Sequence, residues 1–195
     1  MIHLAKSLNP TQFIGLTAYL FAATSCTVAW AASRNAPRPS RLAAVFAVLE
    51  AALVLDMAFN IRWRLHDALQ AEAVRADLYT HRAAPQLAAL GLLGVAAVTG
   101  MGLAFQYLRG RTGATLATCG VILSLSCWGA EVVSFHAIDA VFYHTVHKVK
   151  MVSLCWVAFS MMTGLGILWE ARAARSIAKQ GAKSAAKPPS SLTSS

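Results

Sequence analysis

The chain has 195 residues, of which 57% are hydrophobic and only 13% are charged. Soluble globular domains are typically about 45–50% apolar and about 25% charged. The apolar residues also come in runs of roughly twenty, the length that crosses a hydrocarbon core about 30 Å thick. These features exclude an ordinary soluble domain and predict an all-α integral membrane protein.

The net charge of +9 does not indicate a nucleic-acid partner. Lys and Arg lie at the ends of the apolar runs and in the C-terminal segment, not on one soluble face. Such positions are typical of topology signals and of contacts to anionic lipid. We therefore expect membrane lipid, and no nucleic acid, as a partner.

Five apolar runs are long enough to cross a membrane. All six prolines lie outside these runs or at their edges, so each span is expected to be a continuous helix. The predicted spans cover about residues 12–30, 41–63, 86–108, 113–135 and 151–169. Residues 1–172 would then form a single transmembrane helical bundle.

Two further segments lie outside the predicted spans. Residues 65–80 repeat apolar side chains at helical spacing with charges between them, which predicts an outer amphipathic helix. Residues 173–195 are rich in Ala, Lys and Ser, and we expect a disordered basic cytoplasmic tail.

The distribution of Lys and Arg predicts the orientation of the bundle. The loops around residues 34–41 and 109–111, together with the C-terminal segment, hold more Lys and Arg than the loops on the other side. The positive-inside rule then places the C-terminus in the cytoplasm and the N-terminus outside, in a multi-pass protein of the cell inner (plasma) membrane. A competing interpretation makes the first span a cleaved signal peptide, because Ala29-Trp-Ala31 resembles a small-residue cleavage site.

The histidines gather on the predicted outer side. His136, Asp139, Tyr143 and His147 recur at i, i+3, i+7 and i+11, which is one face of a helix that continues past the fourth span. Imidazole nitrogens and carboxylate oxygens are ligands for zinc, copper and iron, and two histidines can hold a haem. Interfacial hydrogen bonding and pH sensing are the alternatives. The predicted metal ligands are His66, His136, Asp139, His144 and His147.

Acidic residues inside the spans are a second signal. A charged carboxylate near the bilayer centre costs about 2.5–3.5 kcal/mol, so each one requires a partner, a proton or a function. Protonation with a hydrogen bond to a neighbouring helix would satisfy Glu50, whereas Asp56 and Glu131 can pair with Arg62 or Arg64. The sequence predicts a polar cluster between the second and fourth spans, below the outer surface. Its members are Glu50, Asp56, Asn60, Arg64 and Glu131.

Three functions follow from these patterns, and the sequence assigns no catalytic residue. The first is a membrane protein whose outward-facing His/Asp/Glu cluster binds copper, iron, haem or zinc for redox chemistry or metal handling. The second is a non-catalytic subunit or assembly factor of a larger complex, or a homo-oligomer, in which the glycine-rich third span forms the central or intersubunit packing. The third is a transporter coupled to protons or cations through Glu50, Asp56 and Glu131.

Overall fold

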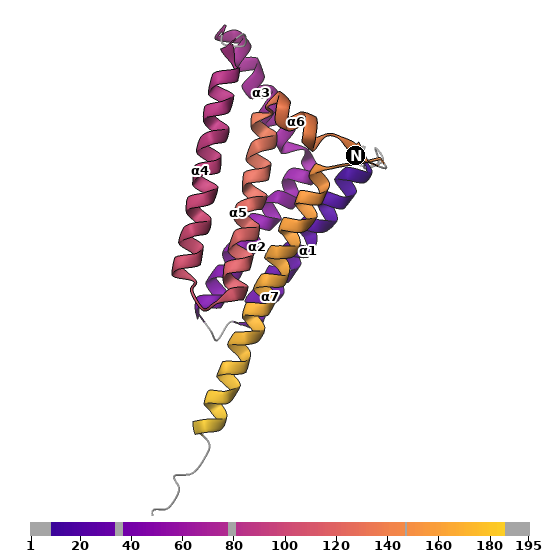
Figure 1. The fold of residues 1–195 in the computed structure, drawn as a ribbon. Helices are drawn as coiled ribbons and strands as arrows, with labels where there is room; N and C mark the ends of the chain where they lie inside the picture. The colour runs from indigo at the N-terminus through magenta and orange to yellow at the C-terminus, as the bar shows by residue number, and fades with distance from the viewer. Residues whose placement is uncertain (1–8, 34–36, 78–80, 147, 186–195) are drawn as a thin grey trace, which may run out of the picture.

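The structure is a computed structural model that describes residues 9–33, 37–77, 81–146 and 148–185. Its long helices lie side by side in a bundle, and the last of them extends well past one end (Figure 1). The helices are α1 (Pro10–Ala32), α2 (Pro37–Phe59), α3 (Ile61–Arg75), α4 (Ala83–Tyr107), α5 (Thr112–Val133), α6 (His136–Phe142) and α7 (Val152–Ala185). A short antiparallel ribbon of β1 (Thr145–Val146) and β2 (Val149–Lys150) joins α6 to α7.

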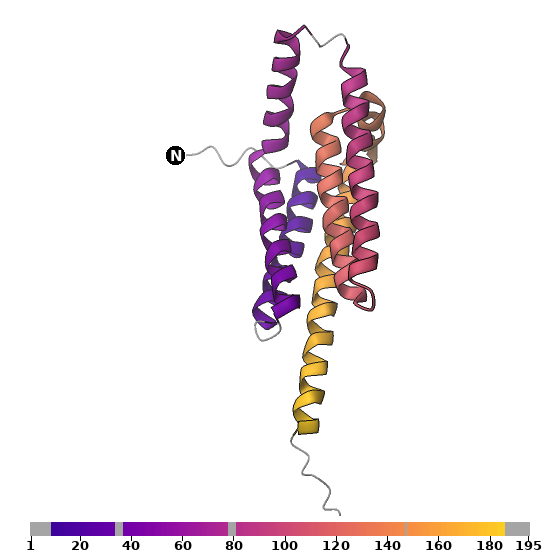
Figure 2. The ribbon, with the colours of Figure 1, turned by 90° about the vertical axis from the view of Figure 1, so that its left-hand side faces the viewer.

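Five helices are long and apolar enough to cross a membrane, as predicted: α1, α2, α4, α5 and α7. The chain is thus an all-α bundle with five helices that are suited to crossing a membrane. Below, the α6 end is the end of the bundle at which α2 and α5 end and α1 and α7 begin. The opposite end, from which α7 extends, is the tail end (Figure 2).

The centre of the bundle is built from α1, α2, α5 and α7. Helix α1 packs along both α2 and α7, and α5 packs along α7, whereas α4 packs mainly against α5 at the edge. The glycine-rich third span was expected to pack at the centre or at an oligomer contact, and in this chain it does not lie at the centre of the bundle. A Cβ atom added at Gly91, Gly94 or Gly102 of α4 would have nothing within 4 Å.

The second predicted span is interrupted near its C-terminal end. Helix α2 ends at Phe59, Asn60 has a left-handed backbone (φ 54°), and α3 begins at Ile61. Asn enters this region more readily than most residues. The prediction of a continuous helix to residue 63 was therefore wrong, and the expected amphipathic helix begins earlier, at Ile61. Helix α3 extends beyond the α6 end of the bundle (Figure 2).

The fourth predicted span also ends early. Helix α5 stops at Val133 because Ser134 adopts a left-handed backbone (φ 48°), and the short helix α6 starts at His136. Since α6 ends at Phe142 and Thr145 lies in the ribbon, no continuous helix joins residues 136–146 to α5. The predicted histidine stripe therefore does not form.

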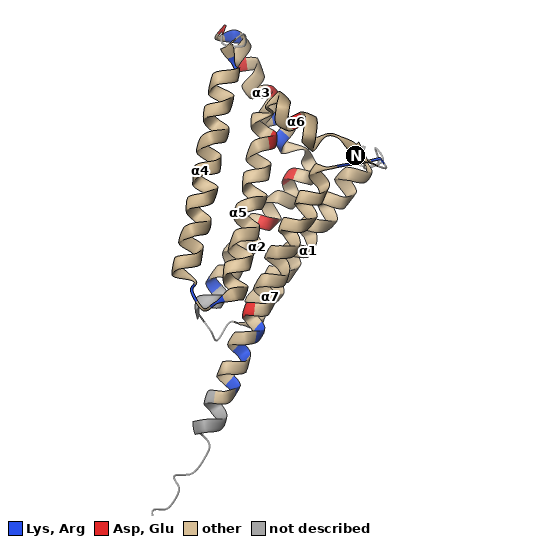
Figure 3. Ribbon diagram, in the orientation of Figure 1, with Lys and Arg blue, Asp and Glu red and all other residues tan. Residues whose placement is uncertain are grey.

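Helix α7 continues to Ala185, into the segment for which we expected disorder. Residues 169–179 contain mostly Ala, Arg, Glu and Lys, which are strong helix formers and propagate the transmembrane helix. Lys and Arg line this extension (Figure 3). The rest of the predicted tail, residues 186–195, lies outside the described residues.

Glu170 links α5 to α7 at the tail end. The Nε of Arg111 donates to Glu170 Oε1 (2.7 Å), and the Ala114 amide donates to Oε2 (3.2 Å). Ala114 lies in the first turn of α5, where backbone N–H groups have no partner within the helix. The carboxylate therefore caps α5, and its negative charge interacts favourably with the positive N-terminal end of the helix dipole.

We expect Glu170→Gln to lower the free energy of unfolding by about 1–3 kcal/mol, because hydrogen bonds to a charged group are lost. The matched control is Glu72→Gln, which breaks the exposed Arg75–Glu72 pair. We expect that change to cost no more than about 0.5 kcal/mol. Thermal unfolding in detergent, followed by circular dichroism, measures both variants. Equal losses would contradict the capping role.

Candidate functional site

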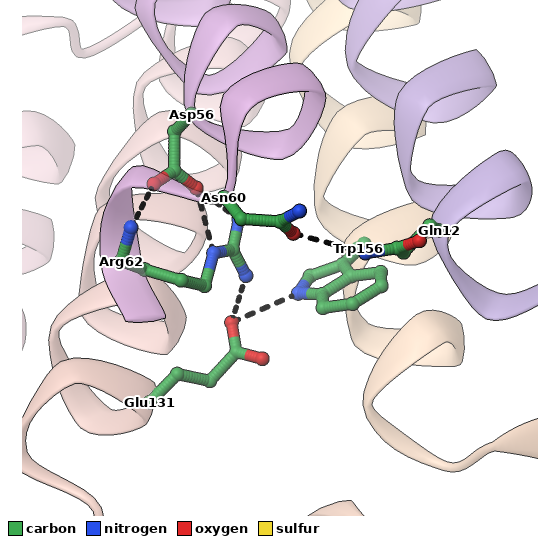
Figure 4. A network of polar contacts seen from close by, with 6 residues as sticks. All are labelled: Gln12, Asp56, Asn60, Arg62, Glu131 and Trp156. Carbon is green, nitrogen blue, oxygen red and sulfur yellow. Dashed lines mark hydrogen bonds and ion pairs between the residues drawn. The ribbon is translucent and has the colours of Figure 1, made fainter. Parts of the chain in front are cut away.

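A buried charge network lies at the α6 end, where α2 meets α3 (Figure 4). The guanidinium of Arg62 lies between two carboxylates, and all three side chains are buried. Its Nε donates to Asp56 Oδ2 (2.6 Å), and its Nη1 donates to Glu131 Oε2. The Trp156 indole also donates to Glu131 Oε2 (3.3 Å), and the Arg62 guanidinium carbon lies 5.2 Å from the centre of the Trp156 ring.

The break at Asn60 creates this network. The Arg62 amide, in the first turn of α3, donates to Asp56 Oδ1 (2.7 Å), so the carboxylate caps α3 as well as pairing with the side chain. Burial lowers the pKa of Arg62, but the carboxylates of Glu131 and Asp56 raise it by more. Arg62 therefore stays charged, and the network contains one carboxyl group more than it has cations.

A polar pocket of about 110 Å³ lies beside the network. This is space for a few water molecules, each of which occupies about 30 Å³ in the liquid. The Gln12 amide donates to Asn60 Oδ1 (2.9 Å) at its wall, and the Lys150 ammonium lies 4.4 Å from the centre of the Tyr143 ring. Burial raises the pKa of Tyr143, and the nearby carboxylates of Glu131 and Asp139 raise it further. Arg62 and Glu131 also line the pocket, so the pocket connects the charge network to the α6 end of the bundle.

The predicted polar cluster forms in part. Asp56, Asn60 and Glu131 come together as expected, but Arg64 is exposed, and Arg62 is the buried partner. Glu50 lies deeper in the bundle, outside this network. No pattern in the sequence singles out Trp156, which lies within the fifth predicted span.

A larger groove of about 680 Å³ lies between α3, α4 and the ends of α5 and α6. His66 Nδ1 lies 3.0 Å from the carbonyl oxygen of Val132. A carbonyl oxygen only accepts, so Nδ1 carries the hydrogen, and Nε2 of the neutral ring holds a lone pair. Leu69, Ala89 and Val132 are among the apolar residues of its walls.

Asp139 contributes a second acceptor to the groove. Its Oδ2 accepts from Ser134 Oγ (2.5 Å), and its Oδ1 is buried with no hydrogen-bond partner among the described residues. The Gln86 amide donates to the Val133 and Ser134 carbonyls (3.2 and 3.1 Å), which satisfies the end of α5.

The structure brings three of the five predicted metal ligands to one groove. His66, His136 and Asp139 line the groove, whereas His144 is an exposed residue after α6 and His147 lies outside the described residues. Within the described part of the chain, no three His, Cys, Asp or Glu side chains are placed to hold a metal ion. The physical reason is the end of α5 at Ser134, which removes the shared helical face.

Comparison with known proteins gives no further guidance to this site. Its chemistry is therefore inferred from its own geometry. No protein family model, no curated protein and no solved structure matches the chain.

Proposed function

We propose that this protein binds a small amphipathic molecule in the groove between α3, α4 and α5. The carrying observation is that a groove with largely apolar walls is lined by two residues that can each offer an acceptor: His66, whose Nδ1 donates to Val132, through Nε2, and Asp139 through Oδ1, which has no hydrogen-bond partner among the described residues. Its volume of about 680 Å³ lies within the range of small-molecule sites, about 300–1,000 Å³. A metal centre is not proposed, because within the described residues no three His, Cys, Asp or Glu side chains are placed to hold a metal ion.

The two acceptors define the class of ligand. A bound molecule must supply hydrogen-bond donors, so its head carries a hydroxyl or a protonated amine. The carboxylate of Asp139 favours the amine, since a charge-assisted hydrogen bond is about twice as strong as a neutral one. The apolar part of the ligand would lie against Leu69, Ala89 and Val132. The groove adjoins the ends of two membrane spans, so the ligand would enter from the lipid phase.

We place the α6 end, and with it the groove, on the outer face of the cell inner (plasma) membrane. Arg109, Arg111 and the basic residues along the extension of α7 lie at the tail end (Figure 3). The positive-inside rule favours a cytoplasmic location for that end.

Binding of dodecylamine to the protein in lipid nanodiscs tests this function. We expect saturable binding, seen by native mass spectrometry, that Asp139→Asn or His66→Ala weakens about tenfold, as expected for a lost hydrogen bond to a charged or basic group. His144→Ala is the control, because that side chain is exposed and outside the groove. Dodecanoate should bind more weakly than dodecylamine. Equal binding of the two probes, or binding unaffected by Asp139→Asn, would contradict the proposal.

A further inference from the structure

The middle of the bundle contains four buried polar residues that no described residue satisfies. The Tyr19 hydroxyl, Ser124 Oγ, Ser160 Oγ and both carboxyl oxygens of Glu50 have no hydrogen-bond partner in the described part of the chain. All four residues are 0% exposed, and each comes from a different helix. A buried polar group without a hydrogen-bond partner destabilises the folded protein, so such groups are rare without a role.

Close packing of α1 fixes the depth of two of these residues. A Cβ at Gly15 would lie 2.6 Å from atoms of both Met57 and Trp156, so these three positions are level across α1, α2 and α7. Tyr19 follows Gly15 by one helical turn, and Ser160 follows Trp156 by one turn, both away from the α6 end. Tyr19 and Ser160 therefore lie at one level, a turn below the charge network.

Glu50 lies about 5 Å deeper than Tyr19, at a rise of 1.5 Å per residue along α2. Thr163 of α7 lies beside Glu50, near enough for the two side chains to interact, but its hydroxyl donates to the Phe159 carbonyl (3.1 Å) and leaves both carboxyl oxygens of Glu50 without a donor in this arrangement. Gly120 of α5 packs against Thr163, and Ser124 lies one turn nearer the α6 end. The unsatisfied oxygens of Tyr19, Ser160, Ser124 and Glu50 thus lie at successive depths between the charge network and the middle of the bundle. We call this set of oxygens the file.

One face of α5 connects the file to the network. Gly120, Ser124, Cys127 and Glu131 follow at intervals of four, three and four residues, and all four are buried. Glu131 also lines the polar pocket at the α6 end. At the α6 end, the file therefore leads through Glu131 to the polar pocket.

Below Glu50 an apolar layer crosses the interior, and the buried polar residues beyond Glu50 toward the tail end include Ser25, Ser33 and Glu170. Ala29 and Phe46 pack with Ile167 in a core layer between Glu50 and the tail end. The ionisable groups that face Glu50 are Tyr19 and Cys26 from α1, while α7 presents the Thr163 hydroxyl and α5 presents Gly120 at this depth. Glu50 has no ion pair among the described residues.

We propose that Glu50 is a proton-binding site that exchanges its proton with the α6 side only. Because no described cation pairs with Glu50, burial favours the protonated, neutral form of its carboxyl group. Release, Glu50–COOH to Glu50–COO⁻ plus H⁺, passes the proton along the hydroxyls of Tyr19, Ser160 and Ser124 to Glu131 and the polar pocket. Each hydroxyl both donates and accepts, so these groups and bridging water can form a relay. This site is separate from the proposed ligand groove and does not depend on it.

Infrared spectroscopy of the full chain, held in one orientation in liposomes, tests the proposal. We expect a carbonyl band of a protonated carboxyl group that Glu50→Gln removes and that Glu50→Asp shifts. D₂O added on the α6 side should shift the wild-type band, and D₂O on the tail side should not. We expect Tyr19→Phe to slow this exchange at least tenfold, roughly the effect of removing one link in a hydroxyl relay.

Glu170→Gln is the control, because that carboxylate is paired with Arg111 at the tail end and should not affect the band. Glu50→Asp keeps the test valid if Glu50→Gln does not fold. A band that survives Glu50→Gln, or exchange at equal rates from both sides, would overturn the proposal. Loss of the band on adding Na⁺ would also overturn it, in favour of a metal-cation site.

Discussion

Arg62→Met should be the most destabilising single substitution of a charged residue in this protein. It leaves the buried carboxylates of Asp56 and Glu131 without their cation, and we expect the free energy of unfolding to fall by about 3–5 kcal/mol. The Asp56 carboxylate would keep its hydrogen bond from the residue 62 amide, whereas Glu131 would keep only the Trp156 indole. Thermal unfolding in detergent, followed by circular dichroism, measures the loss.

Two further variants separate charge from packing. Arg64→Met changes an exposed arginine on the same helix, and we expect an effect within about 0.5 kcal/mol. The triple variant Asp56→Asn, Arg62→Met, Glu131→Gln removes every charge of the network. Replacement of a whole buried ion cluster by neutral residues is often tolerated, so the triple variant should be more stable than Arg62→Met. If the triple variant and Arg62→Met are equally unstable, the loss of stability comes from the lost packing of Arg62 against Trp156 and not from the unpaired carboxylates.

The spans and the clustering of Asp56 with Glu131 could be predicted because each follows from a local property of the sequence. A run of roughly twenty apolar residues must cross or leave the membrane, and a carboxylate within it must find a partner. The identity of the cation could not be predicted. On an unbroken helix Arg62 and Arg64 are both able to reach the acids, and only the left-handed backbone at Asn60 turns Arg62 inward. That conformation is held by contacts from another helix, including the Gln12–Asn60 hydrogen bond.

The histidine stripe failed for a related reason. Residues 134–147 are too polar for apolar periodicity to fix their conformation, so a helix and a turn are both compatible with the sequence. The choice is made by tertiary hydrogen bonds: Gln86 from α4 satisfies the end of α5, and Ser134 bonds to Asp139. His66 and Asp139 nevertheless line the same groove, because both adjoin the end of α5.

The close approach of α5 to α7 was also not predicted, because the glycines of the third span, and not those of the fourth and fifth, were expected to be packing positions. A Cβ added at Gly120 would lie 2.6 Å from the Thr163 amide nitrogen and 2.7 Å from the Phe159 carbonyl oxygen. At Gly166 it would lie 2.6 Å from the Ala117 amide nitrogen. These are backbone atoms, which cannot rotate away as a side chain can. The two helices are therefore in backbone contact, the packing that small residues permit in membranes.

Gly120→Ala should force α5 and α7 apart and lower the free energy of unfolding by about 3 kcal/mol, the upper end of the range for overpacking. The matched control is Gly94→Ala on α4, where the added methyl group has nothing within 4 Å. There the better helix propensity of Ala should stabilise the protein by about 0.5–1 kcal/mol. The same substitution thus has opposite signs at two glycines of neighbouring helices, measured as opposite shifts in Tm. Destabilisation by Gly94→Ala as large as that by Gly120→Ala would mean that α4 is also packed closely in the folded protein.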